Sequence, residues 1–259
     1  MDLKNIIFSK EEGIGWIRFN RPDKLNALNP EVFFELGKVI PICAADDDIR
    51  VVILTGNEKA FAAGADIDHM ANGDIKTAFK LSDEAIVVQE RLADLPKPTI
   101  AAISGYALGG GLEVALCCDF RIAADNAVVG LPEINLGIIP GGGGTQRLPR
   151  LINYCNAAEM IMLGSMIKAE KAERIGILNK VVSAQDLEKE VKAFAQKLMR
   201  QPAMSLRAAK IAMRKGLNTS LKDGIRIEQD LFCMLFGTQD QKEGMAAFIE
   251  KRKPQFQGK

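Results

Sequence analysis

Short apolar segments recur through the first half of the chain, and each is followed by a turn and a stretch of helical character. Two of them, Val51–Thr55 and Thr99–Ile103, are almost wholly apolar, which is typical of strands buried on both faces of a sheet. Helical segments are expected over residues 30–44 and 76–94, so strands and helices alternate along the chain. This alternation predicts the α/β class.

The N-terminal part adds a hairpin and a helix with a clear start. Residues 3–9 and 13–19 alternate around Gly13, as the two strands of a hairpin do. Asn29 and Pro30 suit the cap and the first position of the helix that follows. Further strands are expected at Phe120–Ala123 and Val128–Val129.

Beyond Gly144 the pattern becomes mostly helical. Ser183 to Asp186 has the sequence of a capping box, and apolar residues follow it at helical spacing. Pro202 then interrupts the chain. Three more helices are expected over residues 203–215, 220–236 and 239–252.

The C-terminal helices carry many large apolar side chains, Phe232 and Phe248 among them. Such a surface needs a partner, which is either another subunit or the chain's own core. We expect a core of residues 1–200 and a helical region of residues 201–259.

Composition argues against several classes of function. A net charge of +1 gives no general attraction to nucleic acid or to an anionic membrane, and no run of about 18 apolar residues is present to span a bilayer. Five cysteines without paired spacing favour a reducing compartment, and no signal peptide is evident. The single histidine, His69, cannot by itself form a zinc site or a histidine-based relay. We expect a cytoplasmic protein without a metal site.

Two glutamates stand beside glycine-rich segments: Glu113 follows Gly109–Gly111, and Glu133 precedes Gly141–Gly144. Neither glycine run matches a phosphate-binding loop or a dinucleotide-binding fingerprint. Taken singly, Glu113 is also explained as a first-turn helix residue and Glu133 as one partner of a loop ion pair. Held close together, two carboxylates would share a proton and act as base and acid.

Backbone N–H groups near these glutamates are candidates for binding a negatively charged oxygen. Gly110 is expected where a turn gives way to a helix, near the positive end of the helix dipole. Ala65 lies in the small-residue segment Ala60–Ile67, and its N–H would complete a two-donor site opposite Gly110. Two amides for an oxygen and two carboxylates for a water suit addition or removal of water next to a carbonyl.

At these residues the sequence resembles the crotonase (enoyl-CoA hydratase/isomerase) family. The matching segments occur in the family's order over nearly the whole chain. The resemblance implies a spiral of repeated ββα units, a C-terminal helical region that builds trimers or hexamers, and an acyl thioester of coenzyme A as substrate, without a separate cofactor. The segments are Asn20–Leu28, Ala60–Ile67, Gly105–Glu113 with Cys118–Asp119, Pro132–Leu148 and Glu243–Arg252.

The resemblance also implies roles for individual residues. The N–H groups of Ala65 and Gly110 would bind the thioester oxygen, Glu113 would activate water for attack at C3, and Glu133 would supply the proton to C2. Asp68 departs from the pattern, because many family members carry lysine at this position. The substrate-binding positions that the resemblance implies are Lys24, Leu25, Ala63, Ala65, Asp66, Ile67, Asp68, Gly110, Phe232 and Lys251.

The expected activity is therefore the reversible hydration of short- to medium-chain 2-enoyl-CoA to 3-hydroxyacyl-CoA, a lyase reaction of fatty acid metabolism. Alternatives within the family are a hydratase for a cyclic or dienoyl thioester and an enoyl-CoA isomerase, although isomerases typically work with one carboxylate. A non-enzymatic assembly module would be expected if either Glu113 or Glu133 were lost, and both are present.

Overall fold

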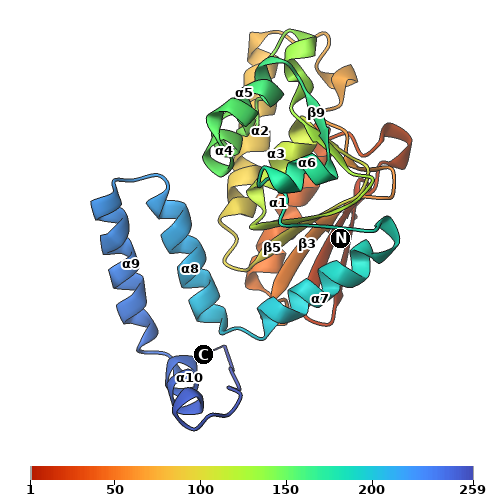
Figure 1. The fold of residues 1–259 in the computed structure, drawn as a ribbon. Helices are drawn as coiled ribbons and strands as arrows, with labels where there is room; N and C mark the ends of the chain where they lie inside the picture. The colour runs from red at the N-terminus through yellow and green to blue at the C-terminus, as the bar shows by residue number, and fades with distance from the viewer. Residues whose placement is uncertain (1, 259) are drawn as a thin grey trace.

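Two β-sheets with helices packed around them, and a helical arm at the C-terminus, make up the computed structural model of the protein, which describes residues 2–258 (Figure 1). The larger sheet has the strand order β1-β2-β3-β5-β7-β10. Its β1–β2 pair is antiparallel, as the hairpin pattern predicts, and the other neighbouring pairs are parallel. The strands are β1 (Ile6–Glu11), β2 (Ile14–Phe19), β3 (Val51–Thr55), β5 (Thr99–Ile103), β7 (Phe120–Ala124) and β10 (Lys180–Val182).

The smaller sheet has the order β4-β6-β8-β9. Its first two pairs are parallel and β8–β9 is antiparallel. Each strand is only three residues long, too short to show an alternating pattern, so β4, β6 and β9 were not predicted from the sequence. The strands are β4 (Ala60–Ala62), β6 (Tyr106–Leu108), β8 (Val128–Gly130) and β9 (Met166–Lys168).

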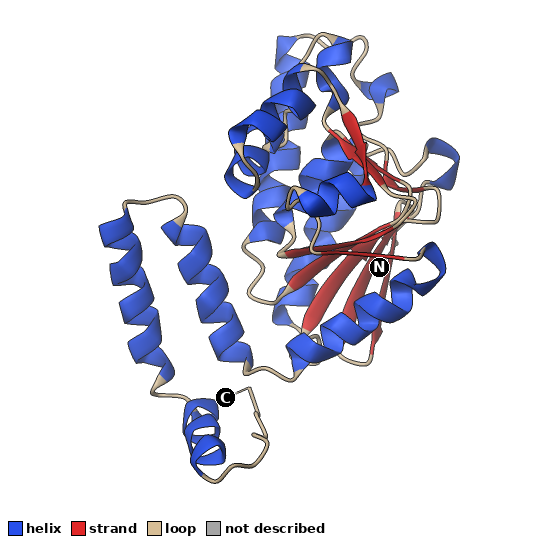
Figure 2. Ribbon diagram, viewed as in Figure 1, coloured by secondary structure: helices blue, strands red, loops and turns tan. Residues whose placement is uncertain are grey.

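From β3 to β8, consecutive strands alternate between the two sheets, which Figure 2 shows as two groups of red arrows. β3 enters the large sheet, β4 enters the small one and helix α2 follows; β5, β6 and α3 repeat the same order. This repetition is a spiral of ββα units, and the predicted fold is confirmed. The helices of the body are α1 (Pro30–Ala45), α2 (Ile75–Ala93), α3 (Gly110–Cys117), α4 (Gly144–Leu151), α5 (Tyr154–Met162), α6 (Ala169–Arg174) and α7 (Leu187–Met199).

Local chemistry explains where several helices begin. Asn29 caps α1 by accepting the N–H of Val32 at 3.0 Å, as the sequence predicts. Before α7 the expected capping box does not form. The Ser183 hydroxyl donates to the Asp186 carboxylate at 2.6 Å, and a short 3₁₀ turn, η4 (Ala184–Asp186), precedes the helix. The serine bonds the side chain instead of a backbone N–H, because η4 separates it from the first turn of α7.

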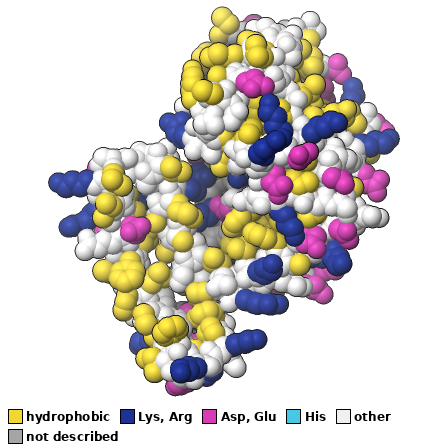
Figure 3. Space-filling model, in the orientation of Figure 1, with side chains coloured by type: hydrophobic (Ala, Val, Ile, Leu, Met, Phe, Trp, Pro, Cys, Tyr) yellow, Lys and Arg dark blue, Asp and Glu magenta, His cyan; other side chains and the backbone are white. Residues whose placement is uncertain are grey.

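The helical arm consists of α8 (Ala203–Gly216), α9 (Leu221–Leu235) and α10 (Gln239–Ile249) and extends away from the sheets (Figure 1). Helix α8 is tied to the body by the ion pair between Lys210 Nζ and Asp119 Oδ2, at 2.7 Å. Helix α9 packs against α8, and none of its residues is buried. Hydrophobic side chains are therefore displayed along the arm (Figure 3), Leu221 and Phe232 among them.

The division of the chain at residue 200 stays a prediction. No helix within residues 2–258 is both long enough and apolar enough to cross a membrane.

Candidate active site

Glu113 is held at the start of helix α3. The helix is capped by Gly109, whose φ of 48° is a conformation that glycine adopts without steric cost. Glu113 lies in the first turn and is 4% exposed. Its Oε1 accepts two backbone hydrogen bonds, from the N–H of Gly142 at 2.8 Å and from the N–H of Gly144 at 2.7 Å. The glutamate is thus bound at both ends, by its own helix and by the loop before α4.

Glu133 comes from the short 3₁₀ segment η3 (Pro132–Leu136) and lies over the start of α3. A Cβ atom on Gly109 would be only 3.0 Å from Glu133 Oε1, so the carboxyl group rests directly on this glycine. Its other oxygen, Oε2, is buried and has no hydrogen-bond partner among residues 2–258. Burial, together with a smaller contribution from the charge of Glu113, raises the pKa of Glu133 to about 7.

The electrostatic balance at Glu113 is different. Burial raises its pKa, but the N–H groups of Gly144 and Gly142 and the positive charge of Arg147 act in the opposite direction. The two carboxyl groups are close enough for one charge to affect the other. They titrate as a pair, with the proton favoured on Glu133 and the negative charge favoured on Glu113.

Two backbone N–H groups face the same region. A Cβ atom on Gly110 would be 3.7 Å from the nitrogen of Ala65, so the two residues are neighbours in space. Leu28 fixes the chain around Ala65, because it donates to Gly64 O and accepts from the Asp66 N–H, both at 2.8 Å. Within residues 2–258, neither the Ala65 nor the Gly110 N–H donates a hydrogen bond. Both donors remain available to an oxygen atom placed between them.

A hollow opens beside Ala65 and contains seven of the predicted substrate-binding residues. Residues that line it take part in two ion pairs. Arg21 Nη2 lies 2.7 Å from the buried Asp66 carboxylate, and Lys24 Nζ lies 2.9 Å from the exposed Asp68 carboxylate. The lining residues are Asp23, Lys24, Leu25, Ala27, Ala63, Ala65, Asp66, Ile67 and Asp68.

Two predicted substrate-binding residues lie elsewhere in the chain. Phe232 is on α9 and Lys251 is the second residue after α10, and both helices belong to the arm that extends away from the body (Figure 1). Their predicted contacts with substrate stay predictions.

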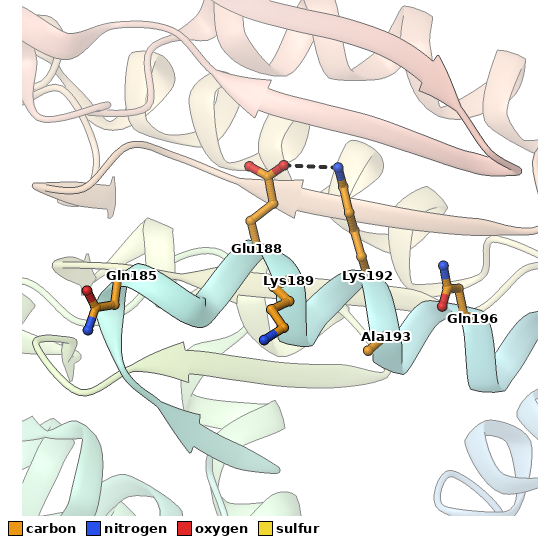
Figure 4. A pocket seen from close by; sticks show the side chains of 6 residues that line it. All are labelled: Gln185, Glu188, Lys189, Lys192, Ala193 and Gln196. Carbon is orange, nitrogen blue, oxygen red and sulfur yellow. Dashed lines mark ion pairs between the residues drawn. The ribbon is translucent and has the colours of Figure 1, made fainter.

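A second hollow lies along helix α7 (Figure 4). Two of the residues that line it, Lys192 and Glu188, form an ion pair at 3.1 Å. It contains none of the predicted site residues. No cluster of three or more side chains able to hold a metal ion occurs within residues 2–258.

The contact between the second glycine run and Glu113 was not predicted from the sequence. The segment Gly141–Gly144 resembles a turn that leads the chain away from Glu133, yet it brings two amides onto Glu113. A Cβ atom on Gly142 would be 2.7 Å from Glu113 Oε2, so a larger residue at this position would have to displace the Glu113 carboxylate. Gln89 and Arg147 also adjoin the site and were not predicted, because no local pattern links residues so far apart in sequence.

Comparisons with known proteins agree with the geometry. A family model described as enoyl-CoA hydratase/isomerase matches residues 9–259. The chain is 43% identical to crotonyl-CoA hydratase of Syntrophomonas wolfei over 99% of both chains. It is 42% identical to short-chain-enoyl-CoA hydratase of Clostridium acetobutylicum, over 98% of this chain and 97% of the other. The crystal structure of enoyl-CoA hydratase from Bacillus anthracis matches with a TM-score of 0.94 at 39% identity, over 98% of this chain and 100% of that one.

Proposed function

The chain belongs to the enoyl-CoA hydratase/isomerase family, and we propose that it is an enoyl-CoA hydratase that adds water reversibly across the 2,3 double bond of short- to medium-chain 2-enoyl-CoA. Relatives named as hydratases align over nearly its full length, which supports a hydro-lyase activity. Coenzyme A is part of the substrate, and the reaction requires no separate cofactor.

The thioester oxygen binds between the N–H groups of Ala65 and Gly110. Both donors lack a partner within residues 2–258 and lie beside each other, which supports this role. Withdrawal of electrons toward the bound oxygen makes C3 electrophilic and stabilises the enolate that forms when hydroxide adds there. Each donor of such an oxyanion hole typically lowers the barrier by about 3 kcal/mol.

The two glutamates divide the proton transfers. Glu113, whose charge is stabilised by two amides, takes a proton from the water that attacks C3. Glu133, whose pKa of about 7 keeps a large protonated fraction at neutral pH, donates a proton to C2 of the enolate. The product thus receives a hydroxyl group at C3 and a proton at C2. A proton then passes from Glu113 to Glu133, which restores the starting protonation of the two carboxyl groups.

The hollow next to Ala65 receives the coenzyme A portion of the substrate. Lys24, Leu25 and the segment from Ala63 to Asp68 line it, which supports their assignment to substrate binding. The single observation that carries the proposal is the convergence of the buried Glu113 carboxyl and the half-buried Glu133 carboxyl with two free N–H donors near the start of α3.

The test is a direct assay. Crotonyl-CoA is mixed with the protein, and the ultraviolet absorbance of the conjugated thioester is followed. Loss of absorbance with formation of 3-hydroxybutyryl-CoA is expected. An unchanged absorbance, together with turnover of a dienoyl or a β,γ-unsaturated thioester, would contradict the proposal and favour a different member of the family.

We also propose that the arm assembles the protein as a trimer or as a hexamer of two trimers. The exposed apolar residues of α9 and α10, such as Phe232 and Phe248, support this, because they find no cover within residues 2–258. Light scattering on the purified protein should give a mass of three or six chains; a monomer would contradict it. Five free cysteines suit the reducing conditions of the cytoplasm, where we place the enzyme.

A further inference from the structure

Arg147, on helix α4, joins the loop before that helix to helix α2. Its Nη1 donates to the Gly142 carbonyl at 2.7 Å and to Gln89 Oε1 at 3.3 Å. Its Nη2 forms an ion pair with the Glu90 carboxylate. The side chain is 19% exposed, so most of the guanidinium is covered by these partners. One planar group thus binds acceptors from two separate elements at once.

The partners of Arg147 are the groups that surround Glu113. Gly142 accepts from Arg147 through its carbonyl and donates to Glu113 through its N–H. Gln89 is 2% exposed, and its amide nitrogen lies 2.5 Å from where a Cβ on Gly142 would be. The orientation of Gly142 is therefore fixed on one side by Arg147 and on the other by the carboxylate.

We propose that Arg147 is a positioning residue for hydration. It clamps the loop of residues 141–144 against α2, so that the N–H groups of Gly142 and Gly144 hold Glu113 Oε1 in place. This inference rests on the proposed function, because it assigns the purpose of the clamp to the carboxylate that activates water.

Loss of the clamp has two consequences. The loop gains freedom, so Glu113 occupies its productive position for less of the time. In addition, the two N–H hydrogen bonds to Glu113 and the effect of the nearby positive charge are weakened. Because all of these lower the pKa of Glu113, its pKa rises. The charged or titratable groups that bear on Glu113 are Arg147 from α4, Glu133 from η3 and the buried Cys117 from α3. Glu90 from α2 forms its ion pair with Arg147.

The closing experiment compares Arg147→Gln with Arg150→Gln. Arg150 is on the same helix, but within residues 2–258 its only hydrogen-bond partner is Gln146, through O at 2.9 Å and Oε1 at 3.1 Å. For Arg147→Gln we expect kcat with crotonyl-CoA to fall about 10- to 100-fold, since small misplacements of a reacting group have effects of this size. KM should change by less than about threefold, because the substrate hollow is not altered. Arg150→Gln should match the wild type.

Two further measurements separate positioning from a general loss of stability. Since Glu113 must be ionised to act as a base, a raised pKa moves the acidic limb of the kcat/KM profile to higher pH in Arg147→Gln. Hydrogen exchange read by mass spectrometry should show faster exchange in the peptide spanning residues 140–146 and an unchanged rate in β3 and β5. Arg147→Lys should restore part of kcat, because it keeps the charge but cannot bridge the acceptors.

The outcomes keep the two proposals apart. A wild-type protein without hydratase activity overturns the proposed function, while hydrogen exchange still tests the clamp. An active wild type with an Arg147→Gln variant that is folded, has kcat within twofold and shows an unshifted acidic limb overturns the positioning role. If Arg147→Gln does not fold, Arg147→Lys and Gln89→Leu undergo the same measurements, and wild-type values in both overturn the inference.

Discussion

Two regions of this molecule bury glutamate, and they treat it in opposite ways. At the N-terminal hairpin, Glu35 of α1 is 6% exposed and both its oxygens are used. Oε1 accepts from Lys4 N–H and Asn5 Nδ2, each at 3.0 Å, and Oε2 accepts from Asn5 N–H at 2.9 Å. At the site, one oxygen of Glu113 accepts both backbone N–H hydrogen bonds that the side chain receives. Glu133 has a buried oxygen without a hydrogen-bond partner in residues 2–258.

The difference separates a carboxylate that holds the fold together from the two carboxyl groups to which the proposed function assigns the proton transfers. A buried carboxyl oxygen without a hydrogen bond costs free energy, because the group has lost its water and gained nothing in return. Glu35 avoids this cost by joining the start of the chain to α1. Glu133 does not avoid this cost. Because burial destabilises its charged form, the cost appears as a raised pKa. In this molecule, incomplete hydrogen bonding therefore distinguishes Glu113 and Glu133 from Glu35 more sharply than burial does.

The largest effect expected from this comparison is on turnover. Glu113→Gln and Glu133→Gln should each lower kcat about 10²- to 10⁴-fold, because an amide can neither take nor give the proton. Glu35→Gln should leave kcat within about twofold, measured per folded molecule with crotonyl-CoA. Near-normal turnover in Glu113→Gln or Glu133→Gln, or a comparable loss of kcat in Glu35→Gln, would contradict this distinction between the site glutamates and Glu35.

The next effect is on stability at neutral pH. Glu35→Gln replaces an acceptor of three hydrogen bonds by a group that presents only one carbonyl oxygen, and we expect unfolding free energy to fall by about 2 kcal/mol. Urea unfolding followed by circular dichroism measures it. Asp48→Asn is a suitable control, since Asp48 is an exposed partner of Lys10. Equal stability of Glu35→Gln and wild type would show that the bonds to Glu35 are not structural.

A smaller effect on the unfolding free energy, of opposite sign, is expected for Glu133→Gln. Its pKa is raised from an ordinary 4.5 to about 7 in the folded protein, so the unfolded chain releases the proton first as pH rises. The carboxyl then destabilises the fold progressively between these two values and by its full amount above pH 7. Glu133→Gln should therefore raise the unfolding free energy at pH 8, by about 1 kcal/mol after allowance for solvent screening of a half-buried group.

Below pH 4 the carboxyl is neutral in both states, and the advantage of Glu133→Gln should vanish. Urea unfolding at the two pH values gives the comparison. A variant less stable than wild type at pH 8 would mean that Glu133 contributes to the fold as Glu35 does.

The sequence predicts those features that depend on neighbouring residues. The apolar runs of β3 and β5 and the Asn29 cap of α1 are local signals, and the structure confirms them. The four residues of the site also stand out locally, through glycines beside Glu113 and Glu133 and through the small residues around Ala65. Their convergence depends on the fold, and the family resemblance anticipated it.

Other features arise only in three dimensions. The strands of the smaller sheet are three residues long, so their identity depends on the partners they meet and not on a periodic pattern. Arg147 lies within the matching segment Pro132–Leu148, but it is 58 residues from Gln89, and no local pattern links the two. The turn at Gly142 has an ordinary glycine-rich sequence, and its contact with Glu113 follows from the packing of α3 against α4.

The smallest effect concerns a carboxylate of a third kind, one that is partnered but exposed. Asp68 binds Lys24 at 2.9 Å at the edge of the substrate hollow, and this hydrogen bond raises the pKa of Lys24. While Asp68 holds it, the ammonium group is less available to the phosphates of coenzyme A. Asp68→Asn should free it and lower KM for crotonyl-CoA about two- to fivefold without changing kcat, an effect that shrinks at high salt.

Crotonyl-pantetheine provides the matched control for Asp68→Asn, because it has the same reacting group and no phosphates. Its KM should be the same for Asp68→Asn and wild type if the charge of Asp68 acts on the phosphates alone. An equal change with both thioesters would instead mean that Asp68 shapes the loop next to Ala65. In that case the exposed Asp68 would act on the site through structure, as Glu35 acts on the fold. Exposure would then no longer distinguish Asp68 from a structural carboxylate such as Glu35.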